Sequence, residues 1–199
     1  ILGIVTVDDI IDVIVEEYNE DILEMGGVSK EESLDTTLLQ SIKLRLPWLL
    51  INLITAFMAS FTVKVFEGTI AQVVALSSIM TIISGMGGNA GSQTQSILVR
   101  QIATDKVEFK RDWKSFAKEI FLGVINGTVN GLITAIIVMI LYHNVFLGVI
   151  TVIAMIGNLV VAGIFGFLVP VILDKFGADP AVSSSIFVTT ATDVLGFFI

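Results

Sequence analysis

The chain has 199 residues, of which 54% are hydrophobic and only 15% are charged. Soluble domains carry roughly 25% charged residues, so this composition excludes an ordinary water-soluble globule. The chain contains no cysteine, which excludes a disulfide-stapled scaffold, a thiolate metal site and a cysteine nucleophile. The net charge of −8 is unevenly distributed: residues 1–35 hold eleven acidic residues and one basic residue, whereas the remainder holds eight acidic and ten basic residues. An acidic segment is therefore joined to a weakly basic body.

The acidic segment begins with an apolar run, residues 1–5, that is typical of a β-strand. Thr6 or one of the two aspartates that follow it is expected to cap a helix that ends near residue 24. Because a lone strand and helix bury no core, we expect residues 1–24 to be the end of a larger cytoplasmic domain. Residues 34–46 predict a second short helix, which Pro47 separates from the first long apolar run.

Four long apolar runs follow. Residues 47–63, 70–99 and 120–173 carry no charge, and residues 181–199 carry Asp193 alone. A bilayer core of ~30 Å needs about 20 helical residues, so these runs predict one, one, two and one crossings. The expected fold class is an all-α integral membrane protein with five transmembrane helices per subunit and a short cytoplasmic strand/helix remnant at the N-terminus.

The basic residues indicate the orientation of the five predicted spans. With the N-terminal end inside, ten of the eleven Lys and Arg residues lie in cytoplasmic segments, and only Lys64 lies outside. Because cytoplasmic loops are enriched in Lys and Arg, we expect a multi-pass protein of the cell (inner) membrane with a cytoplasmic N-terminus and an extracytoplasmic C-terminus. In residues 105–120 aromatic and basic side chains occupy different helix faces. This pattern predicts either a helix in the cytoplasmic headgroup layer or a solvated surface helix, beginning at Asp105 and Glu108.

Asp193 is the one charge placed deep in a predicted span. Ser185 and Thr189 precede it at four-residue intervals on the same helix face, and Thr190 and Thr192 flank that face. A charged group in hydrocarbon is costly unless it is paired or faces water, so we interpret Asp193 as part of an ion or proton site. The alternative is an aspartate that joins helices by a hydrogen bond.

Residues 85–93 form a second unusual feature, because four of the first seven residues are glycine. Each glycine weakens a helix by up to ~1 kcal/mol relative to alanine, so we expect an interrupted helix whose freed carbonyls act as oxygen ligands beside Asn89, Ser92 and Gln93. The alternative is close helix packing through small residues. Packing is also the preferred interpretation of other small or polar residues in the third and fourth spans: Gly123, Gly127, Gly131, Gly157, Asn158, Gly163 and Gly166.

The candidate ligands are oxygen atoms only, which favours a hard cation over zinc or copper. Magnesium dehydrates reluctantly, so it suits a wide polar pore that holds the hydrated ion through one or two carboxylates. One Asp193 per chain becomes two in a twofold dimer, and a divalent cation between them offsets their mutual repulsion.

Residues 87–93 are similar to the GGNxGxQ stretch of the MgtE-type magnesium transporters. Asp179-Pro-Ala followed by Thr192-Asp-Val resembles the fifth span of that family with its essential aspartate. Residues 3–13 resemble the closing strand and helix of a cystathionine-β-synthase (CBS) domain, and residues 16–21 resemble the acidic linker after it. The resemblance implies three parts: residues 1–24 as the C-terminal remnant of a cytoplasmic CBS domain, 25–46 as linker and connecting helix, and 47–199 as a five-span pore domain.

The resemblance implies a magnesium channel or transporter, not an enzyme, built as a homodimer with a central pore lined by the second and fifth spans. The metal site it implies contains Asp193, Asn89, Gly88, Ser185 and Thr189. The pore lining it implies contains Gly85, Gly87, Gly91, Gln93 and Thr192. Ser185 departs from the family pattern, because asparagine is usual at that position.

The resemblance further implies that cytoplasmic Mg²⁺ closes the pore by binding between the CBS domains, the linker acids and the membrane domain. Electrostatics supports the same idea, since crowded acids beside the pore mouth repel one another until divalent cations screen them. The expected sensor residues are Asp12, Glu16, Glu20, Asp21 and Glu24. The expected partners are membrane lipid, a second copy of the chain and a nucleotide at the CBS region, with no nucleic acid.

Two functions other than transport are alternatives. A membrane-embedded enzyme would use Asp193 as acid or base with Thr190 or Ser184 as nucleophile, but no second carboxylate, His or Cys lies at comparable depth in the sequence. A non-transporting CBS-linked membrane sensor would leave Asp193 and the glycines of residues 85–93 without a reason to lie in the membrane.

Overall fold

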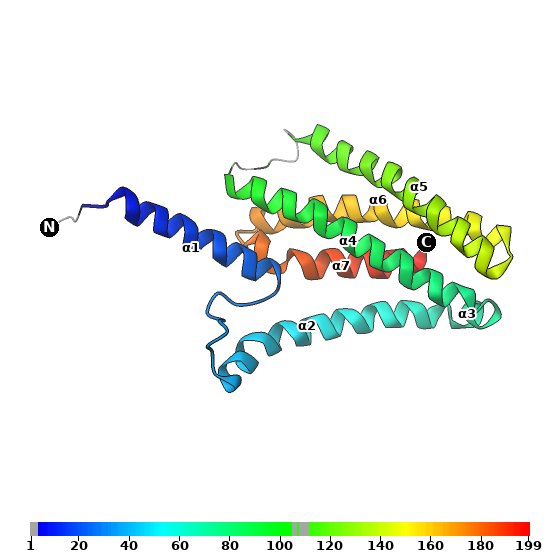
Figure 1. The fold of residues 1–199 in the computed structure, drawn as a ribbon, viewed down its shortest axis with the longest axis horizontal. Coiled ribbons are helices and arrows are strands. Elements are labelled where there is room, and N and C mark those ends of the chain that lie inside the picture. Colours follow the sequence, from blue (N-terminus) through cyan, green and yellow to red (C-terminus); the bar gives the residue numbers. More distant parts are fainter. Residues whose placement is uncertain (1–3, 105–106, 108–111) are drawn as a thin grey trace.

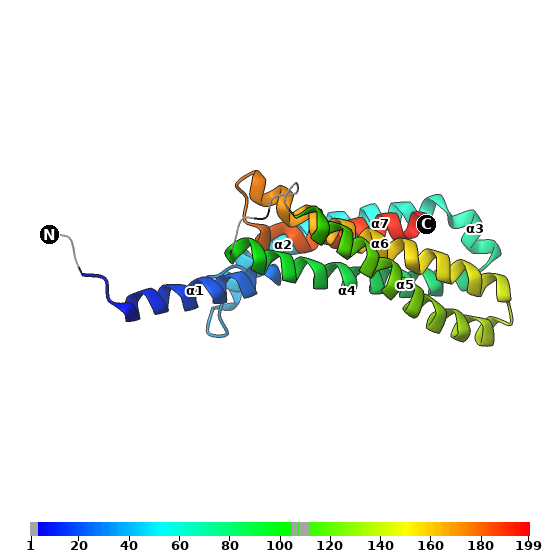
Figure 2. The same ribbon diagram turned by 90° about the horizontal axis from the view of Figure 1, so that it is seen from above.

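The structure is a computed structural model that describes residues 4–104, 107 and 112–199, including all of their side chains except those of residues 182–184. These ranges fold into α1 (Val7–Met25), α2 (Leu38–Val65), α3 (Glu67–Gln72), α4 (Ala75–Thr104), α5 (Trp113–Tyr142), α6 (Val145–Lys175) and α7 (Pro180–Phe198). The long helices α2 and α4 to α7 run side by side, and α1 extends away from one end of this bundle (Figures 1 and 2).

The predicted N-terminal strand is wrong in the part that the structure describes. Residues 4–6 are irregular, and residues 1–3 lie outside the described residues. Helix α1 begins at Val7 with a capping box, in which Asp9 N donates to Thr6 Oγ1 at 3.3 Å and Thr6 N donates to Asp9 Oδ2 at 2.8 Å. The capped helix satisfies its own backbone groups, whereas a strand needs a neighbouring strand, and the described segments offer none.

The predicted break at Pro47 is also wrong, because α2 continues through it from Leu38 to Val65. Proline removes only one helical hydrogen bond, the one to the carbonyl of Lys43, and the turns on both sides maintain the helix. At 1.5 Å per residue the 28 residues of α2 form a rod about 42 Å long. The connecting helix and the first apolar run are therefore one element.

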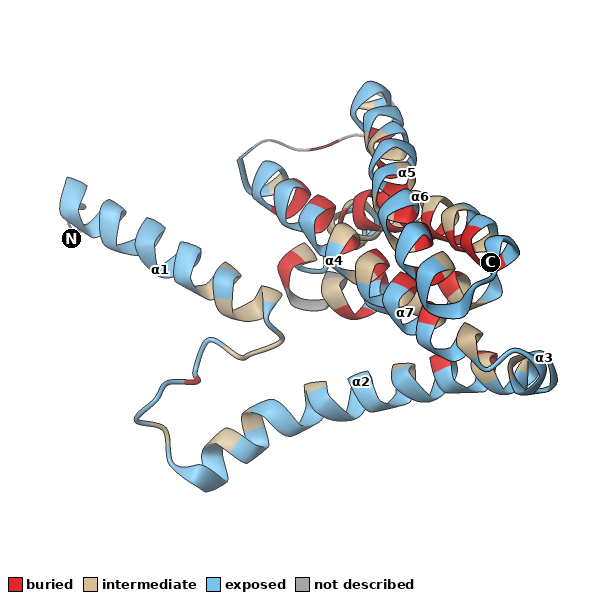
Figure 3. Ribbon diagram, turned by 45° about the vertical axis from the view of Figure 1, so that its right-hand side comes forward, coloured by how far each residue is buried: buried red, intermediate tan, exposed pale blue. Residues whose placement is uncertain are grey.

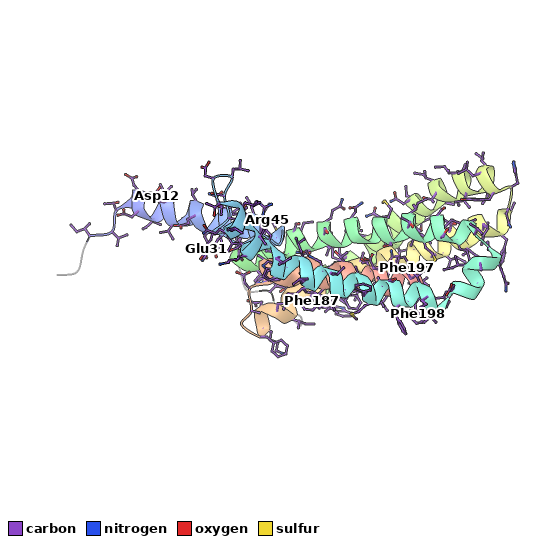
Figure 4. The ribbon with its side chains drawn as sticks, turned by 90° about the horizontal axis from the view of Figure 1, so that it is seen from below. Asp12, Glu31, Arg45, Phe187, Phe197 and Phe198 are labelled. Carbon is purple, nitrogen blue, oxygen red and sulfur yellow. The ribbon has the colours of Figure 1, made fainter. Side chains whose placement is uncertain are left out.

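A salt bridge ties the linker to the start of α2. Glu32 is only 7% exposed, and its Oε1 accepts hydrogen bonds from Arg45 Nη2 at 2.9 Å and from Ser41 Oγ at 2.8 Å. Asp12 lies far out along α1, away from the bundle (Figure 4). These bonds thus fix the linker to the first two turns of α2.

Helices α2, α5 and α6 are each long and apolar enough to cross a bilayer. In α7 the described apolar segment, Ser185–Phe198, is shorter, and α4 carries the glycines and polar residues of positions 85–93. An all-α membrane protein is confirmed, and the count of five spans remains a prediction. Of the helix predicted at residues 105–120, Asp105 and Glu108 lie outside the described residues, and residues 113–120 form the first two turns of α5 instead of a separate helix.

Buried residues gather in α4, α5, α6 and α7, while α1 and α2 are exposed along most of their length (Figure 3). One apolar cluster joins α4 to α6 around Ile83, Met155 and Leu159, and a second joins α4, α5 and α6 around Leu98 and Phe167. Helices α5 and α6 approach so closely that a Cβ on Gly127 would lie 2.6 Å from Ile156 Cα. The packing role predicted for the glycines of α5 is confirmed.

Gly127→Ala is expected to lower the free energy of unfolding by about 2 to 3 kcal/mol, because the added methyl group meets backbone that cannot move without separating α5 from α6. Thermal unfolding in detergent measures the change. Gly68→Ala is the matched control, since a Cβ there meets nothing within 4 Å. Equal melting temperatures for the two variants would contradict the close α5–α6 contact.

Candidate functional site

Helix α7 carries Asp193 into the middle of the bundle. The helix starts at Pro180, and Asp179 caps it by accepting a hydrogen bond from Ala181 N at 2.7 Å. Asp193 lies thirteen residues after Pro180, about 20 Å along the helix axis. Its side chain is partly exposed, whereas the neighbouring Thr192 is fully buried at 0% exposure. The carboxylate therefore lies at the edge of the packed interior, at mid-bundle depth.

The partner of Asp193 is Ser84 of α4, whose hydroxyl donates to Asp193 Oδ1 at 2.5 Å. Helices α4 and α7 run antiparallel (Figure 1). Two turns after Ser84 on α4, Gly91 packs against Val188, which lies five residues before Asp193 on α7. A Cβ on Gly91 would lie 2.5 Å from Val188 Cγ1. These two pairs set the register of the helices. Ser84 was not among the predicted site residues, because a serine in an apolar run carries no signal of which residue faces it on another helix.

The predicted interruption of the second span is wrong, since α4 is helical without a break from Ala75 to Thr104. Packing replaces the lost helix propensity: Gly87 is buried against Asn158, and Gly91 is buried against Val188 and Ala162. The carbonyls of residues 85–93 are thus committed to the helix instead of being freed as ligands. The alternative of close packing through small residues is the better description of Gly87 and Gly91.

The other predicted residues of this stretch lie on the more open side of α4. Gly85, Asn89 and Gln93 are exposed, Gly88 is half-buried, and a Cβ on Gly85 or Gly88 would meet nothing within 4 Å. On α7, Thr189 is exposed and Ser185 is half-buried. Along the bundle axis, Gly88 and Thr189 lie between the Ser84–Asp193 contact and the Gly91–Val188 contact. We call the set made of Ser84, Gly85, Gly88, Asn89, Ser185, Thr189 and Asp193 the polar stripe.

The polar stripe offers oxygen atoms and one carboxylate. Within the described ranges no three His, Cys, Asp or Glu residues come together in a way that could hold a metal ion. Such a stripe in a single chain provides one charge and several neutral oxygens, which suits contact with a hydrated hard cation more than direct coordination of a bare one.

A second polar contact lies nearer the α1 end of the bundle. Thr94 Oγ1 donates to Glu119 Oε2 at 2.9 Å, and a small cavity of about 140 Å³ beside this pair is lined also by Gln93, Lys118 and Asn126. Thr94 lies ten residues from Ser84 on α4, or about 15 Å along the helix. Glu119 is therefore too distant to form a pair of catalytic carboxylates with Asp193.

The structure divides the predicted sensor residues between two faces of α1. Asp21 faces the start of α7 across an open pocket of about 510 Å³, whose other acidic residues are Glu17, Asp174 and Asp179. Burial, followed by repulsion from Asp179, raises the pKa of Asp21 above its usual range, and the same two causes raise the pKa of Glu24. We call the lining acids Glu17, Asp21, Asp174 and Asp179, together with Glu24, which Asp179 also repels, the acidic pocket.

The remaining predicted sensor residues lie elsewhere. Glu20 Oε1 pairs with Lys30 Nζ at 2.7 Å, and Asp12 and Glu16 line a separate depression with Lys30 and Glu31. Sequence reasoning missed Asp174 and Asp179 as members of the acidic pocket, because the turn between α6 and α7 is distant from α1 in sequence and only the fold joins them.

Fold and site together define an all-helical membrane protein with a carboxylate-bearing polar stripe between two of its bundle helices. Residues 80–199 match the model of the MgtE family, described as divalent cation transporter. The chain belongs to the MgtE family, and this family consists of transporters, not of enzymes.

Three relatives carry the name magnesium transporter MgtE. The chain is 36% identical over 199 residues to that of Enterococcus faecalis, 32% over 204 residues to that of Bacillus subtilis and 31% over 202 residues to that of Thermus thermophilus. Each match covers 100% of this chain and 44% of the relative, so the chain spans less than half the length of the relatives it matches.

Proposed function

We propose that this chain moves hydrated Mg²⁺ across the membrane along the polar stripe, with Asp193 as the charged group that attracts the ion. The observation that carries the proposal is the Ser84–Asp193 contact at mid-bundle depth in a chain of a divalent cation transporter family. The names of the three relatives support Mg²⁺ as the ion. A hard cation that keeps its water shell fits hydroxyl, amide and carboxylate oxygens.

The pore is proposed to form between two copies of the chain. One chain supplies a single carboxylate, and two chains related by a twofold axis would bring two Asp193 side chains together. Two such carboxylates repel each other, and one divalent cation between them neutralises both charges. The open side of α4 at Gly85 and Asn89 is the surface that a second copy would complete as pore lining.

The basic residues support the proposed orientation. The starts of α2, α5 and α7 and the ends of α4 and α6 lie at the α1 end of the bundle, and Lys64 lies at the opposite end (Figure 1). With Lys and Arg enriched on the cytoplasmic side, the α1 end is cytoplasmic and the C-terminus is extracytoplasmic in the cell (inner) membrane. A tag placed after Ile199 tests this orientation, since labelling from the cytoplasmic side would overturn it.

Gating by cytoplasmic Mg²⁺ is proposed to act through the acidic pocket. Residues 1–24 as the end of a CBS domain and 25–46 as linker would carry this signal to the pore domain at 47–199. Burial raises the pKa values of Asp21 and Glu24, and repulsion from Asp179 raises them further, which supports a site where like charges lie close together. Hydrated cations attracted to the acidic pocket would screen this repulsion and draw α1 onto the start of α7, at the cytoplasmic mouth.

Reconstitution of the chain in liposomes tests transport directly. Uptake of external Mg²⁺ into vesicles that contain a fluorescent Mg²⁺ indicator is expected to exceed uptake into protein-free vesicles and to saturate with Mg²⁺ concentration. Absence of uptake from correctly folded protein would overturn the proposal in favour of a non-transporting membrane sensor.

Ser84→Ala is expected to raise the Mg²⁺ concentration for half-maximal uptake about tenfold, because groups that orient a metal-binding side chain typically contribute 10- to 100-fold to affinity. Thr81→Val is the matched control one turn away on α4, since the Thr81 hydroxyl bonds only to the carbonyl of Ser77 in its own helix. Equal half-saturation in the two variants would show that the Ser84 contact is not used by the ion.

A further inference from the structure

Asn158 of α6 is a polar residue in the apolar centre of the bundle. It is 0% exposed, and its amide fills the seam where α4 and α7 meet α6. A Cβ on Gly87 of α4 would overlap this amide, and a Cβ on Gly196 of α7 would lie 2.7 Å from Asn158 Oδ1. The amide fits only because the residue facing it on each of the two helices is a glycine.

The two ends of the amide have unequal environments. Asn158 Nδ2 donates to the carbonyl of Ile83 at 2.7 Å, whereas Oδ1 is buried without a hydrogen-bond partner. An incompletely bonded amide is costly in an apolar interior, and a leucine of similar shape would fill the seam without that cost. Packing alone therefore does not account for an amide at this position.

The hydrogen-bonded end of the Asn158 amide indicates what this side chain does. Ile83 immediately precedes Ser84, so the hydrogen bond from Asn158 holds the turn of α4 from which the Ser84 hydroxyl reaches Asp193. The other end of the amide contacts Gly196, three residues after Asp193 and one turn along α7. One side chain of α6, which lies outside the polar stripe, thus contacts both helices that form the Ser84–Asp193 pair.

We propose that Asn158 is a positioning residue, which orients the Ser84 turn of α4 against α7 and so sets the affinity of Asp193 for the divalent cation. This inference rests on the proposed function of Asp193. Asn158 acts through Ser84 and does not itself touch the ion.

The test is Asn158→Leu in the full chain reconstituted in liposomes, with Mg²⁺ as the probe. The Mg²⁺ concentration for half-maximal uptake is expected to rise about fivefold, the equivalent of one neutral hydrogen bond, while the maximal uptake rate changes little. Thr151→Val is the matched control, since Thr151 is also 0% exposed on α6, two turns earlier, and bonds only within its helix, to Leu147 O at 2.7 Å. This control is expected to leave half-saturation unchanged.

A double-mutant cycle separates positioning from general packing. Because Asn158 acts through Ser84, adding Asn158→Leu to Ser84→Ala is expected to change half-saturation by less than about twofold beyond Ser84→Ala alone. Effects that multiply, or a leucine variant that behaves like Thr151→Val, would overturn the proposal. If the leucine variant does not fold, Asn158→Ala serves in the same cycle, because its methyl group reaches neither glycine.

Comparison of Asn158→Leu with Asp193→Asn separates this inference from the function on which it rests. Loss of uptake in Asp193→Asn together with normal half-saturation in Asn158→Leu would reject the positioning role and leave the transport proposal standing. Unchanged uptake in Asp193→Asn would reject the transport site itself.

Discussion

Asp193→Asn is expected to reduce Mg²⁺ uptake into liposomes at least about 100-fold. The substitution keeps the size of the side chain and its ability to accept a hydrogen bond from Ser84, but it removes the charge of the polar stripe. Losing one charge from a close charge pair costs roughly 3 kcal/mol or more, which corresponds to that factor. Initial rates of uptake, measured with an internal Mg²⁺ indicator, provide the number.

Glu67→Gln is the matched control for this experiment, because it makes the same change of charge at an exposed position in the short helix α3. Its uptake is expected to stay within about twofold of the unchanged chain, as exposed charges contribute little and are screened by salt. Transport that survives in Asp193→Asn, or that falls equally in both variants, would contradict a specific role for the Asp193 carboxylate.

Asp179→Asn and Asp21→Asn are expected to make closing of the pore depend less on cytoplasmic Mg²⁺. Each removes one charge from the acidic pocket, as protonation does, so α1 should dock with less Mg²⁺ and the ratio of uptake at low to uptake at high internal Mg²⁺ should fall. Asparagine caps helices as well as aspartate does, so Asp179→Asn keeps the hydrogen bond from Ala181 N that begins α7. Uptake measured against a series of internal Mg²⁺ concentrations gives this ratio.

Glu16→Gln is the control for this pair, since it makes the same charge change on α1 but lies in the depression beside Lys30 and Glu31 instead of the acidic pocket. Its inhibition by Mg²⁺ is expected to be unchanged. A sensor spread over all the acids of α1 would instead give Glu16→Gln and Asp21→Asn the same effect, which would contradict the assignment to the pocket.

The acidic pocket also predicts that the docking of α1 on α7 depends on pH. The pKa values of Asp21 and Glu24 are raised in the docked state, so this state binds more protons than the undocked state between the ordinary and the raised pKa. Docking of α1 on α7 therefore strengthens as the pH falls through this window and weakens as it rises. Residues 26–37 should be protected from limited proteolysis at acid pH without Mg²⁺, and also at neutral pH with Mg²⁺. Acid protection that is unchanged in Asp21→Asn would contradict the role of the raised Asp21 pKa.

Local sequence features were sufficient to predict the bounds of some helices but not of others. Thr6 and Asp9 form a capping box within four residues, so the start of α1 was predictable apart from the preceding strand. Pro47 and the glycines of residues 85–93 suggested breaks that the structure does not have. At both places a weak local preference is outweighed by a long continuous helix, and at Gly87 and Gly91 also by close contact with other helices.

The sequence by itself determined the all-α membrane class, the separation of an acidic segment from an apolar body, and Asp193 as the charge to explain. These follow from composition along the chain, because a bilayer requires long apolar helices and makes an unpaired charge costly wherever it occurs. Only the tertiary structure decided that Ser84 meets Asp193, that Asn158 joins α4 to α7, and that Asp21 faces Asp179. The physical reason is that the register between helices is set by which side chains interlock across their seams, and contacts between residues 75 to 158 positions apart leave no local pattern in the sequence.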